Sequence, residues 1–459
     1  MRRRDALKQI GALAGAGAAA RLLPGCGDNA GAPESGITTL VVVCMENRSY
    51  DHYLGARALQ GLPGDGLTAG MSNPDPLGGE IATYHETTFC VPDPPHSWDG
   101  SRTCWNDGAN DGFVQAYRDR HGGEIAPYVM GHFEREDIPV TWAIADAHAT
   151  CDRWFSSLLG PTWPNRMYLH SGQSGGLRTN DFPGQGGIPW PSIHHRLTDA
   201  GVPWAYYYQD LPFVPLFIGV EVDSTVRRFD HEFFDDAEAG RLPPVSFIDP
   251  AFTFNDDHPP HHPIFGQQLL ATIYRTLAAS PQWNNCLLVV TYDEAGGFFD
   301  HVSPPRAADD RAADDFDQLG FRVPAMAAGP YVKAGHVSSV VRDHTSVLAH
   351  IEAMFGLEPL TARTAAAATL DELIDQERLD RRDPAPPAEL PAIEIDESTI
   401  DDFCTGEGAL RHHPTDLEKL ADTGFFAPHL DRRRAMRDTI HAIGDQLDRL
   451  GGGRIRRGR

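Results

Sequence analysis

Short, strongly apolar runs recur along the chain, and several of them end abruptly in polar residues. Residues 38–44 (TTLVVVC) and 286–290 (CLLVV) are almost continuously apolar and rich in β-branched side chains, as expected of strands that are buried on both faces of a sheet. The remaining runs that we predict to be strands are residues 140–147, 202–208, 245–249 and 323–328.

Apolar residues at helical spacing lie between these runs. Residues 264–279 and 345–355 both show this spacing, which predicts an amphipathic helix in each. Asp343 stands where it can cap the second of these helices. Strands that alternate with helices in this way predict an α/β fold, with a mostly parallel sheet flanked by helices.

The rest of the chain carries weaker patterns. Residues 60–110 are rich in Gly, Pro and Asp and are expected to be loops. The acidic, proline-rich residues 376–402 are expected to run over the surface, residues 417–450 to be helical, and the basic end GGGRIRRGR to be disordered. The chain then divides into a linker, a single main domain and a C-terminal extension, at residues 27–37, 38–375 and 376–459.

Residues 1–26 resemble an export signal and are not expected to belong to the fold. The basic start MRRRDALK contains a twin arginine, and residues 10–20 are weakly apolar and too short to span a bilayer. This pattern resembles a Tat signal, which exports folded proteins to the periplasm or beyond. Residues 22–26 (LLPGC) resemble a lipobox, in which a lipidated Cys26 would anchor the protein to a membrane. Because Pro24 is unusual there, cleavage by an ordinary signal peptidase is the alternative.

Composition excludes one class of partner. The chain has 459 residues, 41% of them hydrophobic, which is enough for a large core. Its formal net charge of −25 argues against a nucleic-acid partner, because binding phosphate backbones needs a basic face. An acidic protein can still bind a phosphate ester if a metal ion and local cations neutralise it.

Cysteine positions suggest one disulfide in an oxidising compartment. Cys90 and Cys104 flank a short loop-rich stretch, and we predict that they pair. Cys44 and Cys286 stand in predicted strands and are expected to be buried thiols.

Carboxylates follow two of the predicted strands directly. Glu46 and Asn47 come after the first strand, and Asp293 and Glu294 come after residues 286–290. Open α/β sheets place their chemistry at the carboxyl ends of strands, and paired carboxylates suit a hard or borderline divalent cation. The alternative for the Asp-Glu pair alone is a turn with solvated acids.

A threonine stands between these two sites in the sequence GPTWPNRM. Thr162 lies among Gly and Pro just before a plausible helix, where backbone N–H groups and the helix dipole favour a phosphate. Its hydroxyl is a weak nucleophile unless a base or a metal lowers its pKa. Taken alone, Thr162 fits a helix cap or a turn residue better than a nucleophile, and the two carboxylate sites reverse this preference.

Five blocks of sequence occur in order between residues 41 and 352. They read VVVCMENRSYDHYLG, GPTWPNRMYLHSG, DDHPPHHPIFG, VVTYDEAGGFFDHVSPP, and RVPAMAAGPYVKAGHV followed by RDHTSVLAHIE. The chain resembles, over residues 38–357, the bacterial phosphoesterase family that contains non-haemolytic phospholipases C and a respiratory-burst-inhibiting acid phosphatase. The resemblance implies an alkaline-phosphatase-like α/β fold, a metal ion, and a Ser or Thr that becomes phosphorylated.

The resemblance also assigns roles to residues of this chain. Thr162 matches the nucleophile, and three histidines match those around the phosphoryl group, although each of them could also be structural: His96, His258 and His301. His261 and His262 look like additions beside the motif. Two pairs match metal-binding residues: Glu46 with Asn47, and Asp293 with Glu294.

These matches imply a phospholipase C that hydrolyses phospholipid-like phosphodiesters through a phosphothreonine, with His301 or His258 protonating the leaving alcohol. One divalent metal ion is implied; oxygen ligands suit Ca²⁺ or Mg²⁺, and added histidines would favour Zn²⁺. The alternative is an acid phosphatase that acts on small phosphomonoesters with the same residues. A third reading, a non-catalytic lipoprotein that binds phospholipid, is disfavoured because Glu46, Thr162, Asp293 and Glu294 are intact.

The chain departs from the larger phospholipases C of this family at its C-terminal end. Those proteins carry long C-terminal modules, whereas about 100 residues follow the last block here. This difference weakens the transfer of phosphatidylcholine specificity. An aromatic cage for a choline cation could draw on Trp98, Trp163 or residues 206–208, but those aromatic residues could equally belong to the core.

Overall fold

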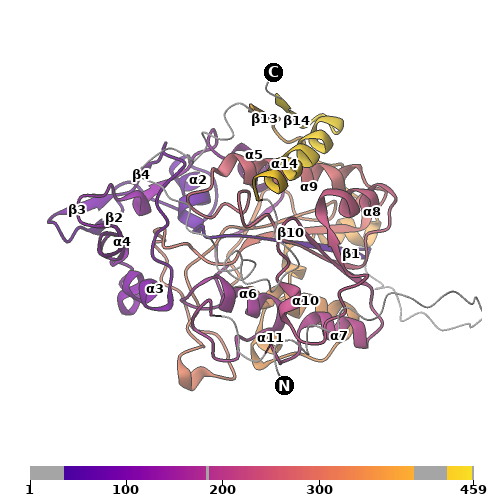
Figure 1. The fold of residues 1–459 in the computed structure, drawn as a ribbon, viewed down its shortest axis with the longest axis horizontal. Coiled ribbons are helices and arrows are strands. Elements are labelled where there is room, and N and C mark those ends of the chain that lie inside the picture. The colour runs from indigo at the N-terminus through magenta and orange to yellow at the C-terminus, as the bar shows by residue number, and fades with distance from the viewer. Residues whose placement is uncertain (1–35, 182–185, 397–431, 457–459) are drawn as a thin grey trace, which may run out of the picture. The chain divides into compact units, whose positions relative to one another are not determined.

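An eight-stranded sheet forms the centre of the computed structural model, which describes residues 36–181, 186–396 and 432–456 (Figure 1). The strand order is β12-β6-β11-β10-β1-β9-β7-β8, and every neighbouring pair is parallel except the two that include β11. The strands are β1 (Thr39–Met45), β6 (Ala149–Cys151), β7 (Trp204–Tyr208), β8 (Val226–Arg228), β9 (Val245–Ile248), β10 (Cys286–Tyr292), β11 (Ala325–Ala328) and β12 (His336–Ser338). The predicted mostly parallel α/β sheet is therefore confirmed.

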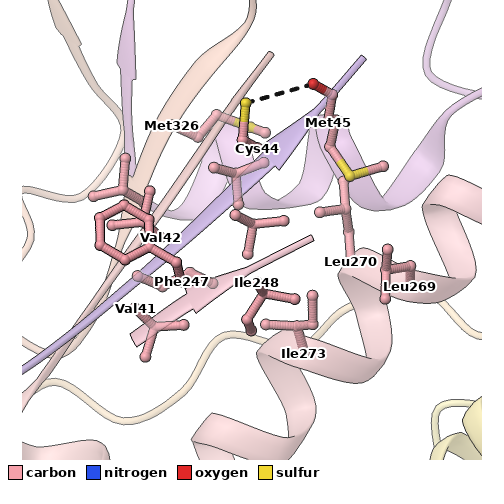
Figure 2. Packing of buried hydrophobic residues seen from close by; sticks show 14 of the residues in the cluster. Val41, Val42, Cys44, Met45, Phe247, Ile248, Leu269, Leu270, Ile273 and Met326 are labelled. Atoms are coloured by element: carbon pink, nitrogen blue, oxygen red, sulfur yellow. Dashed lines mark hydrogen bonds between the residues drawn. The ribbon is translucent and has the colours of Figure 1, made fainter. Parts of the chain in front are cut away.

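The two most apolar strands are the central pair. β1 and β10 run in parallel, with Thr39 opposite Cys286 and Met45 opposite Tyr292, and every residue of both strands is buried. The continuous apolar pattern arises because helices cover both faces of this part of the sheet. Figure 2 shows part of this core: Ile248 of β9 lies beside Leu269, Leu270 and Ile273 of α9. Phe247 points to the other face of the sheet, where it contacts His170 of α6 and His194 of α7.

Helices lie on both sides of the sheet (Figure 1). One group contains α5 (Pro139–Ala147), α8 (Phe234–Glu238), α9 (Pro263–Ala279) and α14 (Arg432–Arg449). The other contains α6 (Thr162–Ser171), α7 (Ile193–Asp199), α10 (Thr345–Phe355) and α11 (Ala362–Ala366). The predicted helices at 264–279 and 345–355 correspond to α9 and α10.

One predicted strand is a helix. Residues 140–147 were expected to be a strand, but they belong to α5, which begins with Pro139 in its first turn. Proline at that position favours a helix start, and a helix with most of its surface buried reads as a nearly continuous apolar run. The strand in this region is the short β6 that follows it.

The region predicted as loops, residues 60–110, contains small elements. A helix, α3 (Trp98–Trp105), begins after Ser97, whose hydroxyl accepts a hydrogen bond from the N–H of Gly100. The other short elements near this region are η1 (Asp51–Gly55), α2 (Ala56–Leu59), β2 (Ser72–Pro74), β3 (Glu80–Ala82), β4 (Tyr84–His85), α4 (Phe113–His121) and β5 (Gly131–His132).

Asp343 contacts the first turn of α10, as predicted, but it stands one residue before the N-cap position. The N-cap position of α10 is His344, and the Asp343 carboxylate accepts a hydrogen bond from the N–H of Thr345 at 3.0 Å. The carboxylate therefore still satisfies one N–H of the first turn.

The C-terminal residues pack on the main sheet domain. α14 contacts α9, and Gln446 donates a hydrogen bond to the Thr276 hydroxyl at 3.2 Å. The basic end was expected to be disordered, but β14 (Gly453–Arg456) pairs in parallel with β13 (Ile393–Asp396). Ile455, the one aliphatic side chain in that basic stretch, lies against Gly444 of α14, which explains the order. In the sequence, α12 (Gln376–Arg381) precedes β13. The expected helical residues 417–431 lie outside the described residues.

The cysteines differ in part from the prediction. Cys44 and Cys286 are buried free thiols, as expected. Cys104 is also free and buried, while Cys90 is disulfide-bonded, so the predicted pair of Cys90 with Cys104 is wrong. Among the described helices, none is long and apolar enough to cross a membrane.

Candidate functional site

The carboxyl ends of β1 and β10 bring two predicted pairs of residues together. Because the strands are parallel neighbours, the residues that follow them meet at one edge of the sheet. The N–H of Asn47 donates to Asp293 Oδ1 at 3.0 Å, and the N–H of Asp293 donates to the Met45 carbonyl at 3.0 Å. Asn47 has a φ of +59°, a left-handed conformation that Asn tolerates better than most residues. All four side chains are buried: Glu46, Asn47, Asp293 and Glu294.

Two glycines explain why the DEAGG sequence suits this site. Gly296 has a φ of +63°, and a Cβ atom there would lie 2.2 Å from the carbonyl oxygen of Asn47. Gly297 has a φ of +72°, and its Cβ would lie 2.6 Å from the carbonyl oxygen of Pro95. The two glycines therefore let the turn after β10 contact the loop after β1 and the loop that carries His96.

A third carboxylate comes from the loop after β9. The N–H of Glu46 donates to the backbone carbonyl of Asp256 at 2.8 Å. Asp256 Oδ1 lies 2.6 Å from Nδ1 of His261 and also accepts the N–H of His258 at 2.9 Å. Sequence reasoning missed Asp256 and set His261 aside; their signal was the dense DDHPPHH stretch, in which only His258 was selected.

The oxygen atoms of this cluster fit a divalent cation. Burial, followed by the charges of Asp256 and Asp293, raises the pKa of Glu46, and burial and Asp293 raise that of Glu294. Buried carboxylates that lack donors are costly unless a cation neutralises them. Within this cluster, five buried side-chain oxygen atoms have no hydrogen-bond partner among the described residues: Glu46 Oε2, Asn47 Oδ1, Asp256 Oδ2, Asp293 Oδ2 and Glu294 Oε1. Such a set of hard oxygen donors suits Ca²⁺ or Mg²⁺.

One buried arginine partly balances these charges. Nε of Arg166 lies 3.3 Å from Asp293 Oδ2 and 3.9 Å from Glu46 Oε1. Its other nitrogens reach Asp249 at 3.0 Å and donate to the carbonyl oxygen of Met45 at 3.3 Å. Arg166 was not selected from the sequence, although it stands in the GPTWPNR block.

Arg166 also places Thr162. Thr162 is the first residue of α6 and is 6% exposed. Residues four apart share one face of a helix, and helical side chains lean toward the N-terminus. Since Arg166 reaches Asp293 and Glu46, Thr162 lies on the face of α6 that is turned toward the same carboxylates. The preceding turn is fixed by Asn165, whose Nδ2 donates to the carbonyl oxygen of Gly160 at 3.0 Å.

Two of the three predicted histidines border the cluster. Nε2 of His96 lies 3.4 Å from Asn47 Nδ2 and 3.8 Å from Glu294 Oε1. The rings of His96 and His258 contact each other edge to face, with centroids 5.6 Å apart. Nδ1 of His96 lies 2.8 Å from the carbonyl oxygen of Pro94, and Nδ1 of His258 lies 2.5 Å from the carbonyl oxygen of Pro259. If Nδ1 carries the ring proton, Nε2 is left as the acceptor in both rings.

Asp93 joins these two histidines and was also missed. Its Oδ1 lies 3.3 Å from Nδ1 of His96 and 4.0 Å from Nε2 of His258. Ligand atoms of these three residues lie within 4.8 Å of one another, so they form a second group that could hold a metal ion. Burial lowers the pKa of His258 despite the charge of Asp93, which favours a neutral imidazole.

The third predicted histidine, His301, lies elsewhere. Its Nδ1 is 2.7 Å from Asp51 Oδ2 and its Nε2 is 3.2 Å from Asp65 Oδ1. Arg322, which is fully buried, binds Asp51 at 3.0 Å and Asp300 at 2.8 Å. Within the described part of the chain, none of the hydrogen bonds or ion pairs of His301 reaches the predicted metal-binding residues. The contacts of His301 therefore place it in an ion-pair network, of which the DHV sequence is a part, and do not link it to the predicted metal-binding residues.

Comparison with known proteins gives one consistent family. A model of the Phosphoesterase family matches residues 37–358. The chain is 32% identical over 388 residues to Non-specific phospholipase C6 of Arabidopsis thaliana, which covers 76% of this chain and 74% of that protein. It is also 32% identical over 394 residues to Phospholipase C A of Mycobacterium tuberculosis, with 72% and 74% covered.

Solved structures show a more distant similarity. A protein in the alkaline phosphatase superfamily from Vibrio parahaemolyticus aligns over 77% of this chain and 89% of its own, with 11% identity and a TM-score of 0.35. Phosphonate Monoester Hydrolase of Agrobacterium radiobacter aligns over 74% and 77%, with 10% identity and a TM-score of 0.34.

Proposed function

The chain belongs to the phosphoesterase family and is a phosphoric ester hydrolase, and we propose that it is a metal-dependent phospholipase C acting on phospholipid-like phosphodiesters. The observation that carries this proposal is the group of buried oxygen atoms without hydrogen-bond partners, together with Arg166, which extends from the helix that Thr162 begins to Asp293 and Glu46. A cation there and a hydroxyl at a helix N-terminus are what phosphoryl transfer needs. The named phospholipase C relatives support the diester substrate class.

The proposed nucleophile is the hydroxyl of Thr162. Its Oγ1 attacks phosphorus, the bond between phosphorus and the oxygen of the leaving alcohol breaks, and a phosphothreonine forms. The helix dipole of α6 favours the negative phosphoryl oxygens. A divalent cation held by Glu46, Asn47, Asp293 and Glu294 supplies, when bound, positive charge that neutralises a phosphoryl oxygen and lowers the pKa of the hydroxyl. Asp256 is a further oxygen donor for the same cation.

The proposed proton carriers are His96 and His258. A neutral imidazole whose Nδ1 proton is held by a backbone carbonyl can accept the Thr162 proton at Nε2 and pass it to the leaving alcohol. In the second step, a neutral imidazole of this pair takes a proton from the attacking water. The bond from phosphorus to Oγ1 then breaks, and the Thr162 oxygen regains a proton. Asp93 positions both rings, since it lies near a nitrogen of each.

A paired assay tests this proposal. The purified mature protein is assayed with p-nitrophenylphosphorylcholine and p-nitrophenyl phosphate, each with and without chelator. We expect chelator-sensitive hydrolysis that is faster for the diester. Faster hydrolysis of the monoester would instead identify an acid phosphatase, the alternative that uses the same residues. A protein that binds metal and hydrolyses neither ester would overturn the proposed function.

We also propose that the protein is exported through the Tat pathway and anchored by a lipid on Cys26. The support is the sequence alone, because residues 1–35 lie outside the described part of the chain. Replacing Arg3 and Arg4 by Lys should leave the protein in the cytoplasm. Cys26→Ala should release an exported protein from the membrane fraction, and unchanged membrane attachment would exclude the lipid anchor.

A further inference from the structure

We propose that Trp98, Arg102 and Arg178 form an anion-binding subsite beside Thr162, which selects substrates whose head group carries a second anionic group. This inference rests on the proposed function, because it concerns the head group of the same phosphoester. In the sequence, Trp98 lies between His96 and Thr162. It is the first residue of α3 and follows His96 by two residues.

Two guanidinium groups lie over one indole ring. Cζ of Arg102 is 3.3 Å from the centroid of the Trp98 ring, and Cζ of Arg178 is 4.4 Å from it. Both distances are well inside the range of a cation–π contact. The ring holds the two side chains in place, so an anion that binds them meets a prearranged pair of donors.

Contacts place this pair next to the nucleophile. Arg102 Nη1 donates to the carbonyl oxygen of Leu159 at 2.7 Å, and a Cβ on Gly160 would lie 3.5 Å from the Trp98 ring. Leu159 and Thr162 are three residues apart, so at most about 11 Å of chain separates them. A cavity of about 10 Å³ is lined by Ser101 of α3, by Gly160 and by Glu294, so α3 also borders the metal-binding cluster. A head group that extends from a phosphoryl group at Thr162 could reach the two guanidinium groups.

The charges of the pair are not fully balanced. Arg178 is exposed and donates to the carbonyl oxygen of Asp314 at 2.7 Å, and among the described residues it forms no ion pair with a carboxylate. Arg102 pairs with Asp315 at 3.0 Å, a carboxylate that also pairs with Arg306. Two cations on one ring repel each other unless an anion binds both.

A choline head group fits this surface poorly. Trp163 and Tyr206 are 2% and 0% exposed, so neither offers a face to a cation that enters from solvent. Trp98 carries two guanidinium groups, and these would repel a quaternary ammonium group. Among the aromatic residues considered for a choline cage from the sequence, Trp98 therefore favours an anion instead of a choline cation.

The test compares two lipids that differ in one phosphate group. Mixed micelles carry either phosphatidylinositol or phosphatidylinositol monophosphate, and the ratio of the two kcat/KM values is measured. We expect wild type to prefer the monophosphate by about tenfold, and Arg178→Gln to reduce that preference about fivefold. Arg178→Lys, which keeps the charge, should retain most of the preference.

Arg306→Gln is the matched control. It removes one exposed cation from the same region, paired with Asp315 and Asp317, without touching the Trp98 ring. Its preference should equal that of wild type. Equal rates with the two lipids, or equal loss of preference in Arg178→Gln and Arg306→Gln, would overturn the subsite. If neither lipid nor any other phosphoester is hydrolysed, it is the proposed function that fails, which separates the two outcomes.

Discussion

Arg166 connects the predicted nucleophile with the predicted metal-binding residues at the level of single side chains. It is fully buried, lies one helical turn after Thr162, and reaches Asp293 at 3.3 Å and Glu46 at 3.9 Å. A cation in this position keeps two carboxylates close together before any metal binds. A side chain that was not selected from the sequence thus links the selected residues to one another.

The two histidines His258 and His301 should respond differently to replacement by Gln. His258 borders the cluster, so His258→Gln should lower kcat by about 100-fold or more. His301 is held between Asp51 and Asp65, so His301→Gln should keep kcat within a few-fold of wild type. Steady-state kinetics of both variants check this, and a large kcat loss in His301→Gln alone would restore His301 as the acid.

His301→Gln should change stability in a pH-dependent way. Burial lowers the pKa of His301, but the hydrogen bond and the charge of Asp51 outweigh burial and raise it above the ordinary value. A raised pKa means that the protonated ring stabilises the fold below about pH 6.5 and that this contribution is lost as the pH rises through the raised pKa. The Tm difference between wild type and the variant should therefore be larger at pH 5.5 than at pH 8. A difference that grows with pH would contradict the assignment. The charged groups that face His301 are Asp51, Asp65, Asp300 and Arg322.

Single residues could be selected from the sequence where they directly follow a strand. Glu46, Asn47, Asp293 and Glu294 were found this way, because an apolar run that ends in carboxylates is visible without a structure. Asp93 and Asp256 could not be separated in this way from many other acids, because their positions depend on how loops from distant parts of the chain meet.

At the scale of elements, the turn after β10 is fitted to its neighbours by glycine. Gly296 packs its Cα against the backbone of Asn47 in a left-handed conformation. Side chains larger than hydrogen would separate the ends of β1 and β10, which carry the two pairs of proposed metal-binding residues.

Gly296→Ala tests this fit, with Gly356→Ala as the control. Both glycines have a φ of +63°, but a Cβ on Gly356 would meet nothing within 4 Å. Gly356→Ala should cost about 1–2 kcal/mol for the left-handed conformation alone. Gly296→Ala should cost about 1–3 kcal/mol more, because the Cβ would lie 2.2 Å from the Asn47 carbonyl.

Urea unfolding gives both free energies, and kcat should fall in Gly296→Ala only. Equal costs and equal activities in the two variants would show that the close approach to Asn47 does not matter for the site.

Helices and strands could be predicted from the sequence where a hydrophobic pattern fits only one type of element. The central strands β1, β9 and β10 were found because β-branched apolar runs of this length favour buried strands. Residues 140–147 were predicted to be a strand and not a helix, because α5 is buried over most of its surface and periodicity cannot distinguish such a helix from a strand. The order of β14 was missed because its one aliphatic residue, Ile455, lies in a basic sequence.

At the scale of the whole molecule, the fold places an acidic cluster in a chain that already carries a net charge of −25. The buried oxygen atoms at the ends of β1, β9 and β10 concentrate part of this charge in a small volume. A bound divalent cation therefore should stabilise the folded protein as well as support hydrolysis.

Removing metal should lower activity and Tm together. Binding to the folded state alone stabilises it by about 2.7 kcal/mol at a free metal concentration 100 times Kd. Without metal, burial raises the pKa of Glu46 and Glu294, so their contribution to stability is fully present below about pH 4.5 and is lost as the pH rises. The Tm loss on chelation, measured by calorimetry, should therefore be larger at pH 8 than at pH 5. Glu294→Gln should reduce it, and an unchanged Tm on chelation would argue against a buried cation.

Trapping the covalent intermediate tests the account most directly. The protein is mixed with a phosphodiester substrate, quenched in acid within the first turnover, and analysed by mass spectrometry of its peptides. We predict one phosphoryl group on Thr162, lost in the metal-free protein, retained in Thr162→Ser on the new serine, and absent from Thr162→Ala together with activity. Normal turnover by Thr162→Ala, or a phosphoryl group on another residue, would contradict the account.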